Sequence, residues 1–289
     1  MKTRVSSTTN EVIISGDGPT VLIGERINPA GKKYLGEALK SGNMEVIRRE
    51  AREQVAAGAD ILDVNVGMFG VDETDLLPQV VNIVTETVDI PVCIDSNNAD
   101  AIQAALKVCP GKPLVNSVTG ESRSLERVLP LIKEYGCPVV GLLQDDEGLP
   151  KSVDRRVAIA HKIVERAEKI GISRENMVID CLAFAVGAEP NAAKVTIETI
   201  RRIKEELGVN ITLGASNISF GMPERGIINS SFITMAIAAG ATCLIVDAAR
   251  VRPVILATDL LLGRDKHARR YIADFRKRQQ TKESPGQSQ

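Results

Sequence analysis

Short apolar runs alternate with longer segments of helical period along most of the chain. Eight of these runs are rich in Val, Ile and Leu and are predicted to be strands. They are VLIGERI (21–27), ILDVNV (61–66), PVCIDS (91–96), PLVNSV (113–118), PVVGLLQ (138–144), MVIDCL (177–182), ITLGASN (211–217) and CLIVDA (243–248). Short, nearly continuous apolar runs are typical of parallel strands that are buried on both faces.

The segments between the runs have the pattern of half-buried helices. Segment 124–136 is one example, and segment 192–208 is another. The apolar positions of the second broadly follow the spacing of one helix face. These positions are Val195, Ile197, Ile200, Ile203 and Leu207. Several segments end in a glycine, which favours the left-handed conformation common after a helix. These glycines are Gly136, Gly171, Gly208 and Gly240.

Eight alternating units predict an α/β fold, a closed (β/α)₈ or TIM barrel, over residues 21–279. Such a barrel needs about 250 residues, which suits this chain. An open, doubly wound sheet of six strands is the alternative. Residues 1–20 are expected to be an N-terminal extension, with a possible strand pair around 11–15 that plugs the barrel bottom. Residues 280–289 are polar without periodicity and are expected to be a disordered tail.

The amino-acid composition makes several classes of protein less plausible. Hydrophobic residues make up 44% and aromatic residues only 3%, with no Trp, so the core is expected to consist of branched and small side chains. A net charge of -1 argues against a nucleic-acid partner. The five cysteines are scattered without CxxC spacing, which favours a reducing compartment. No signal peptide or membrane-spanning run is recognised, and a cytoplasmic protein is expected.

Polar residues gather where the predicted strands end. They are Glu25, Asn28, Asp63, Asn65, Asp95, Ser96, Asn116, Ser117, Gln144, Asp180, Ser216, Asn217 and Asp247. In a parallel barrel these positions converge on the C-terminal rim, where the active sites of this fold lie, so an enzyme is predicted. A single Asp at a strand end could instead cap a helix or anchor a loop. This alternative applies best to Asp63 and Asp247.

The residue types restrict the chemistry. Both histidines, His161 and His267, fall in predicted helices, which disfavours Ser–His catalysis and a histidine zinc site. No Lys lies inside a predicted barrel strand, which disfavours a Schiff base. A metal site built from Asp63, Asp95 and Asp180 is an alternative. Asp and Asn together suit a flat heterocycle with alternating donors and acceptors, such as the edge of a pterin.

Six motifs carry a resemblance to a known family. They are GERINPAG (24–31), DVNVG (63–67), CIDSNN (93–98), VNSVTGE (115–121), VIDCL (178–182) and GASNISFG (214–221). In this order they resemble the pterin-binding methyltransferases. That group includes the methyltetrahydrofolate:corrinoid/iron–sulfur-protein methyltransferases and the folate domain of cobalamin-dependent methionine synthase. The resemblance extends from about residue 21 to residue 265.

The resemblance implies roles for individual residues. Tetrahydrofolate or 5-methyltetrahydrofolate is the implied substrate, and no metal is implied on this chain. Asp95, Asn116 and Asp180 are implied to hold the pterin. Asn217 is implied to reach N5, the atom that carries the methyl group, although it could instead cap its loop. The positions implied to line the cavity are Glu25, Asn28, Asp63 and Ser216.

The resemblance also implies partners. The second substrate is a corrinoid carried on a separate protein, because the chain has no DxHxxG-type cobalamin motif, and the methyl group could move in either direction. A homodimer is implied. Loops 28–43, 145–153 and 183–194 are either a docking surface or ordinary loops. Two alternatives remain: a dihydropteroate synthase, disfavoured because residues 215–218 hold no basic residue, and a non-catalytic pterin-binding or corrinoid-docking scaffold.

Overall fold

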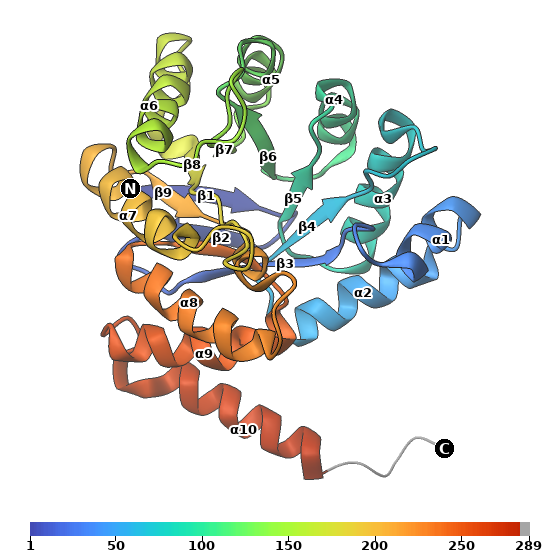
Figure 1. Ribbon diagram of the computed structural model, residues 1–289. Coiled ribbons are helices and arrows are strands. Elements are labelled where there is room, and N and C mark those ends of the chain that lie inside the picture. Colours follow the sequence, from blue (N-terminus) through green and yellow to red (C-terminus); the bar gives the residue numbers. More distant parts are fainter. Residues whose placement is uncertain (284–289) are drawn as a thin grey trace.

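The structure is a computed structural model that describes residues 1–283. A parallel sheet of eight strands lies at its centre, and helices surround the sheet (Figure 1). The strands are β3 (Val21–Ile27), β4 (Ile61–Asn65), β5 (Val92–Asp95), β6 (Leu114–Thr119), β7 (Val139–Leu142), β8 (Met177–Asp180), β9 (Asn210–Thr212) and β10 (Cys243–Val246). Each strand lies within its predicted run or extends beyond it by one residue. Run 211–217 is the most truncated, because residues 215–219 form a short 3-10 helix, η2 (Ala215–Ser219).

The sheet closes into a barrel. Its strands are paired in the order β10-β3-β4-β5-β6-β7-β8-β9. The two end strands also meet, because the Thr242 amide donates to the Ile211 carbonyl at 3.0 Å and the Ile245 amide donates to the Leu213 carbonyl at 3.1 Å. The predicted (β/α)₈ barrel is therefore confirmed, and the open-sheet alternative is wrong.

The helices lie outside the barrel, and most of them cover its strands, whereas α10 packs against α9 (Figure 1). They are α1 (Lys33–Ser41), α2 (Glu45–Ala56), α3 (Glu73–Thr87), α4 (Ala99–Val108), α5 (Ser122–Tyr135), α6 (Val153–Lys169), α7 (Ala192–Glu206), α8 (Arg225–Ala239), α9 (Ala248–Leu261) and α10 (Arg269–Glu283). Helix α5 is representative, since its buried positions Leu125, Val128, Leu129 and Ile132 have the spacing of one face. It ends at Gly136, whose φ of 63° requires the left-handed region.

Alternation along each strand separates two apolar layers. In β5, Cys93 belongs to the cluster inside the barrel, whereas its neighbours Val92 and Ile94 belong to the layer beneath the helices. Successive side chains of a strand point to opposite faces, so every second residue enters the barrel interior. This register decides which polar residues reach the site.

An antiparallel hairpin covers the N-terminal ends of the barrel strands. It consists of β1 (Lys2–Ser6) and β2 (Glu11–Ser15). Val5 and Ile14 are fully buried in the interior cluster. Asn210 Nδ2, at the start of β9, donates to Thr3 Oγ1 and to the Ile14 carbonyl, both at 2.9 Å. The barrel bottom is thereby closed by residues of the N-terminal extension.

The C-terminal part differs from the expected pattern. Helix α10 continues to Glu283, so residues 280–283 of the expected disordered tail are helical. The rest of that segment, 284–289, lies outside the described residues. His267 lies in the short segment η3 (Lys266–Ala268) with φ 58°, so the helix predicted at this position is interrupted there. Within residues 1–283, no helix is both long and apolar enough to cross a membrane.

Candidate active site

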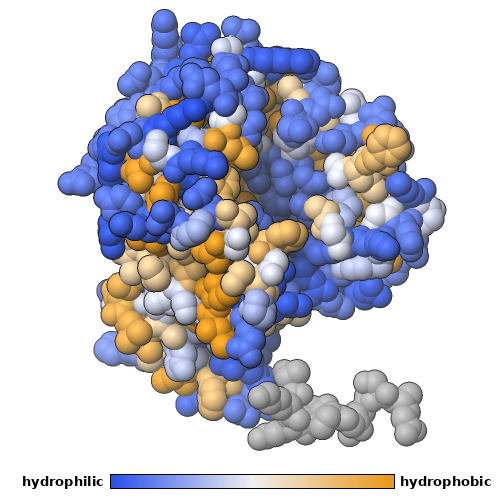
Figure 2. Space-filling model, in the orientation of Figure 1, coloured by the Kyte–Doolittle hydropathy of each residue, from blue (hydrophilic) through white to orange (hydrophobic). Residues whose placement is uncertain are grey.

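A cavity of about 1200 Å³ opens at the C-terminal ends of the barrel strands. Figure 2 shows a hollow on this face of the molecule, with hydrophilic residues inside it. All eight residues that the sequence nominated for substrate contact line this cavity. They are Glu25, Asn28, Asp63, Asp95, Asn116, Asp180, Ser216 and Asn217.

Strand register explains why the acids point into the cavity. Each follows an interior apolar residue by two positions, as Asp63 follows Ile61, Asp95 follows Cys93 and Asp180 follows Val178. A spacing of two keeps a side chain on the same face of the strand. The acids therefore form the next layer above the apolar interior, and they become the floor of the cavity.

Two of these carboxyl groups, Asp63 and Asp95, interact on adjacent strands. Burial raises the pKa of Asp63 well above its usual range, and the charge of Asp95 raises it further. Burial also raises the pKa of Asp95 to about 6, against the opposing effect of hydrogen bonds with Asn65 and Asp63. Asn116 Nδ2 donates to Asp63 Oδ1 at 3.4 Å. Asp63 therefore loses its proton at a higher pH than Asp95, which leaves Asp95 as the first ionised hydrogen-bond acceptor of the pair.

Asp180 is the second ionised acceptor of the floor. Burial raises its pKa to about 6, and this rise is opposed by the Leu182 amide and by the positive charge of Arg156. The Leu182 amide donates to Asp180 Oδ1 at 2.8 Å. With a pKa of about 6, both Asp95 and Asp180 are mostly ionised at neutral pH and can accept N–H groups from a ligand.

Glu25, Ser216 and Asn28 form the wall on the β3 side. Burial raises the pKa of Glu25, and a hydrogen bond from Ser216 opposes the rise. Ser216 Oγ donates to Glu25 Oε1 at 2.9 Å. Asn28 Oδ1 accepts the Ala30 amide at 2.9 Å, so this side chain also shapes its own loop.

Asn217 is exposed at the cavity mouth, in η2. Within residues 1–283 its side chain makes no hydrogen bond, so it does not cap the loop that contains it. A Cβ atom on Gly214 would lie 3.0 Å from Asn217 Nδ2, so the glycine leaves room for this amide. The amide is free to contact a ligand.

The structure adds residues that sequence reasoning missed. Two cations line the mouth: Lys32 Nζ donates to the Arg26 carbonyl at 3.0 Å, and Arg225 Nη2 donates to the Ser216 carbonyl at 2.9 Å. A basic side chain therefore does approach the end of β9, although residues 215–218 contain none. Glu73 also lines the cavity and accepts Ser96 Oγ at 2.6 Å. These residues lie in loops and helix starts, where no strand pattern marks them.

Two of the polar strand ends lie outside the cavity lining. Asp247 caps α9 by accepting the Ala249 amide and forms an ion pair with Arg250. Of the two roles considered for this residue, the structure therefore shows the helix cap. Gln144 Nε2 donates to Glu121 at 2.9 Å. Asp63, in contrast, lies in the floor of the cavity. In residues 1–283, no group of three or more His, Cys, Asp or Glu side chains is arranged to hold a metal ion.

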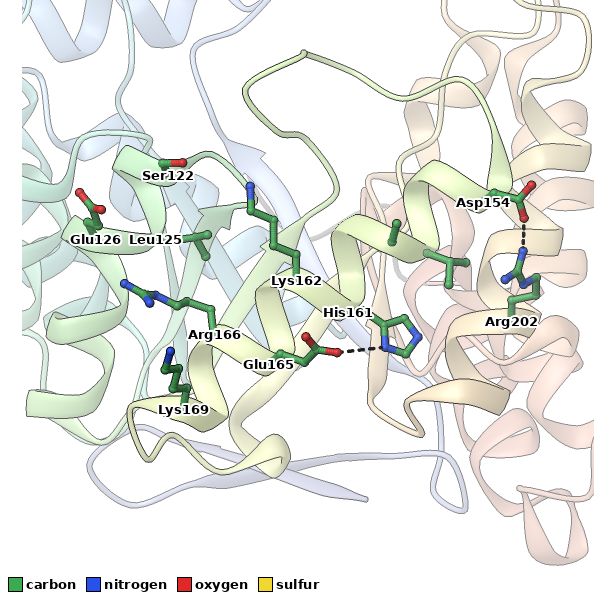
Figure 3. Close-up of a pocket in the computed structure, with 12 residues that line it drawn as sticks. Ser122, Leu125, Glu126, Asp154, His161, Lys162, Glu165, Arg166, Lys169 and Arg202 are labelled. Carbon is green, nitrogen blue, oxygen red and sulfur yellow. Dashed lines mark hydrogen bonds and ion pairs between the residues drawn. The ribbon is translucent and has the colours of Figure 1, made fainter.

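A second groove, of about 800 Å³, lies on the outer surface along α5 and α6. Figure 3 shows two pairs among its polar side chains: Arg202 contacts Asp154, and His161 contacts Glu165. Its lining contains none of the residues at the barrel strand ends. The cavity at the strand ends is therefore the candidate active site.

Comparison with known proteins identifies the family to which this chain belongs. Residues 24–247 match the family model described as "Pterin binding enzyme". A methylcorrinoid:tetrahydrofolate methyltransferase of Eubacterium limosum is 33% identical over 263 residues, which cover 89% of this chain and 96% of that protein. A methionine synthase of Mycobacterium leprae is 30% identical over 250 residues, which cover 82% of this chain and 21% of that protein.

Solved structures share the fold. A dihydropteroate synthase of Yersinia pestis has a TM-score of 0.68 at 15% identity, covering 90% of this chain and 99% of that one. One of Xanthomonas albilineans has a TM-score of 0.66 at 20% identity, covering 91% and 99%. At such identities the likeness establishes the barrel and no more. Because the family match spans nearly all strands that build the cavity, this chain belongs to the pterin-binding enzymes.

Proposed function

We propose that this enzyme transfers a methyl group between N5 of tetrahydrofolate and the cobalt of a corrinoid carried on a separate protein. The observation that carries the proposal is the convergence of eight implied folate contacts in one cavity. The end-to-end similarity to a methylcorrinoid:tetrahydrofolate methyltransferase supports it. The name of that relative describes transfer from the corrinoid to tetrahydrofolate, and the same site serves the reverse direction.

Asp95, Asn116 and Asp180 recognise the pterin edge in this proposal. A carboxylate accepts two parallel N–H groups from an N–C–NH₂ edge, while an Asn amide offers one donor and one acceptor. The pKa of Asp63 is raised by burial and by Asp95, so Asp95 ionises first and is the charged acceptor for the ligand. Glu25, Asn28 and Ser216 complete the wall beside the ring.

In this proposal Asn217 serves N5. In the direction toward the corrinoid, the electron pair of Co(I) forms the new bond to the methyl carbon, the C–N5 bond breaks, and its electrons remain on N5. A solvent water gives N5 a proton as this bond breaks, because an amide anion is a poor leaving group. The Asn217 amide donates a hydrogen bond that stabilises this developing charge, while the rigid barrel supplies orientation.

The rim of the cavity is where a corrinoid protein must dock. Three large apolar side chains are exposed in three rim loops: Phe69 at 97%, Phe220 at 71% and Leu149 at 53%. Leu149 and Phe220 line the mouth, and Phe69 follows the lining residue Gly67 by two positions. Exposed aromatic side chains in such a cluster mark interaction surfaces. Of the rim loops that the sequence nominated, 145–153 contributes Leu149.

Exposed apolar residues on a different face of the molecule support a homodimer. Figure 2 shows hydrophobic residues gathered over the region that α8 and α9 occupy in Figure 1. Ile227 and Met235 of α8 are exposed at 64% and 51%, and Leu261 of α9 at 83%. A second copy of the chain is the occupant that the resemblance implies. A cytoplasmic location is proposed on the five unpaired cysteines, which suit a reducing compartment.

Removing either floor carboxylate is expected to weaken pterin binding. Asp95→Ala and Asp180→Ala each lose a charged acceptor, which lowers the affinity for methyltetrahydrofolate by about 1.5–3 kcal/mol, measured by calorimetry. Asp247→Ala is the matched control, because this strand-end acid lies outside the cavity lining. Unchanged affinity in both floor variants would contradict the proposed pterin site.

Asn217→Ala is expected to reduce the rate of methyl transfer more than the affinity, because its hydrogen bond strengthens in the transition state. The loss of about 1.5–3 kcal/mol corresponds to roughly 10- to 150-fold in single-turnover rate. Stopped-flow spectroscopy of Co(I) absorbance, with a corrinoid protein as acceptor, measures this rate. A parent enzyme that binds methyltetrahydrofolate but never methylates cobalt would indicate the scaffold instead.

Phe69→Ala is expected to raise the KM for the corrinoid protein about 5- to 30-fold, as for an interface residue worth about 1–2 kcal/mol. The affinity for methyltetrahydrofolate should stay unchanged, because Phe69 is outside the cavity lining. Ile13→Ala, on the hairpin at the opposite end of the barrel, is the control. Equal KM values in the two variants would remove Phe69 from the docking surface.

Sedimentation equilibrium is expected to give twice the mass of one chain. Met235→Glu would place a carboxylate in the apolar face of α8, which disfavours its burial between two copies, so this variant should sediment as a monomer. Ile13→Glu should leave the mass unchanged. A parent protein that is already monomeric at micromolar concentration would refute the dimer.

A further inference from the structure

One arginine is buried directly behind the pterin floor. Arg156 lies in α6 and has an exposed fraction of 0%. Its Nη1 donates to the carbonyls of Cys181 and Leu182 at 2.8 and 2.9 Å. Its Nε donates to the Pro150 carbonyl at 3.2 Å. The side chain therefore joins the turn after β8 to rim loop 145–153.

This cation has no carboxylate partner at ion-pair distance within residues 1–283. Its Nη2 is buried without a hydrogen-bond partner in the same range. A buried charge without full compensation costs several kcal/mol, so packing alone does not account for an arginine here. The guanidinium carbon also lies 4.8 Å from the ring centre of Phe184, a residue that lines the cavity.

The backbone held by Arg156 is itself unusual. Leu182 has φ 57°, a left-handed conformation that is unfavourable for a leucine because its Cβ atom crowds the backbone. Its carbonyl accepts from Arg156 and from Thr196 Oγ1, the latter at 2.6 Å. Its amide donates to Asp180 Oδ1 at 2.8 Å. The chain of contacts thus runs from Arg156 through Leu182 to one oxygen of Asp180.

We propose that Arg156 is a positioning residue of the active site, which fixes the turn Asp180–Phe184 so that one oxygen of Asp180 is held by the protein and the other faces the substrate. This inference rests on the proposed pterin site. Arg156 touches neither the pterin nor the reacting atoms and acts through Leu182 and Phe184. Its charge also favours the ionised state that Asp180 needs to accept N–H groups.

The positive charge of Arg156 lowers the pKa of Asp180. The groups that act on Asp180 are Arg156 from α6, Asp95 from β5 and the Leu182 amide, and the buried thiols Cys181 and Cys243 lie near it. Burial and Asp95 raise the pKa of Asp180, whereas the amide and Arg156 oppose the rise. Without the cation the pKa of Asp180 lies above its present value of about 6. Pterin affinity, which requires the carboxylate, would then be lost at a higher pH as the solution is acidified.

The test compares the pH dependence of methyltetrahydrofolate binding in Arg156→Met, Arg156→Lys and Thr196→Val. Thr196→Val is the control for lost hydrogen bonding without a change of charge, since it removes the donor to the same Leu182 carbonyl and also the Thr196 Oγ1 acceptor of Arg156 Nη1 at 3.2 Å. In Arg156→Met the midpoint of the binding curve is expected to rise by about one pH unit, the smaller end of the effect of Arg beside Asp. Arg156→Lys and Thr196→Val should keep the parent midpoint.

A midpoint in folded Arg156→Met equal to that of Thr196→Val would overturn the proposal. If Arg156→Met does not fold, Arg156→Lys decides: it keeps the charge but not the planar set of donors, so a loss of affinity of about 10-fold is expected, and unchanged affinity refutes the role. A parent that fails to bind methyltetrahydrofolate refutes the proposed function instead. The pKa of Asp180 in ligand-free protein, followed by carboxyl carbon NMR, then still tests the link to Arg156.

Discussion

The alternation of side chains in a closed parallel barrel is the constraint on which the site depends. Each strand sends every second residue inward, so the barrel is filled in layers. In this protein the lower interior layers are apolar, and the next layer upward carries Glu25, Asp63, Asp95, Asn116 and Asp180. Because the hairpin β1–β2 covers the bottom, the polar layer faces the open end.

Several carboxyl groups in one buried layer would repel one another if all were ionised. Raised pKa values and hydrogen bonds reduce this repulsion. The pKa of Asp63 is raised beside Asp95, since two buried charges so close together would repel. Asp180 is supported by the Leu182 amide and by the charge of Arg156. The floor thus presents ionised acceptors at defined positions, which is what recognition of a neutral N–H edge requires.

The barrel strands and the rim segments have different roles in the proposed reaction, because the paired strands are more rigid. In the proposed function, strand ends hold the groups that bind the pterin, because their backbone is paired on both sides. Asn217 in η2 and the loop residues Phe69 and Leu149 face the corrinoid protein in the same proposal. In the proposed reaction, orientation of the first substrate and access for the second therefore come from different parts of the fold.

The sequence by itself determined the eight strands and the polar residues at their ends, because period and strand-end position are local properties that do not depend on packing. The number of repeated units indicated the closed barrel. Only the tertiary structure decided which polar ends reach the cavity. Asp247 ends a strand as Asp180 does, yet it caps α9 instead. Arg225, from the start of α8, and Arg156, from the first turn of α6, reach the site through contacts with other segments of the chain. No periodic pattern encodes such contacts, since they depend on how helices and loops pack around the barrel.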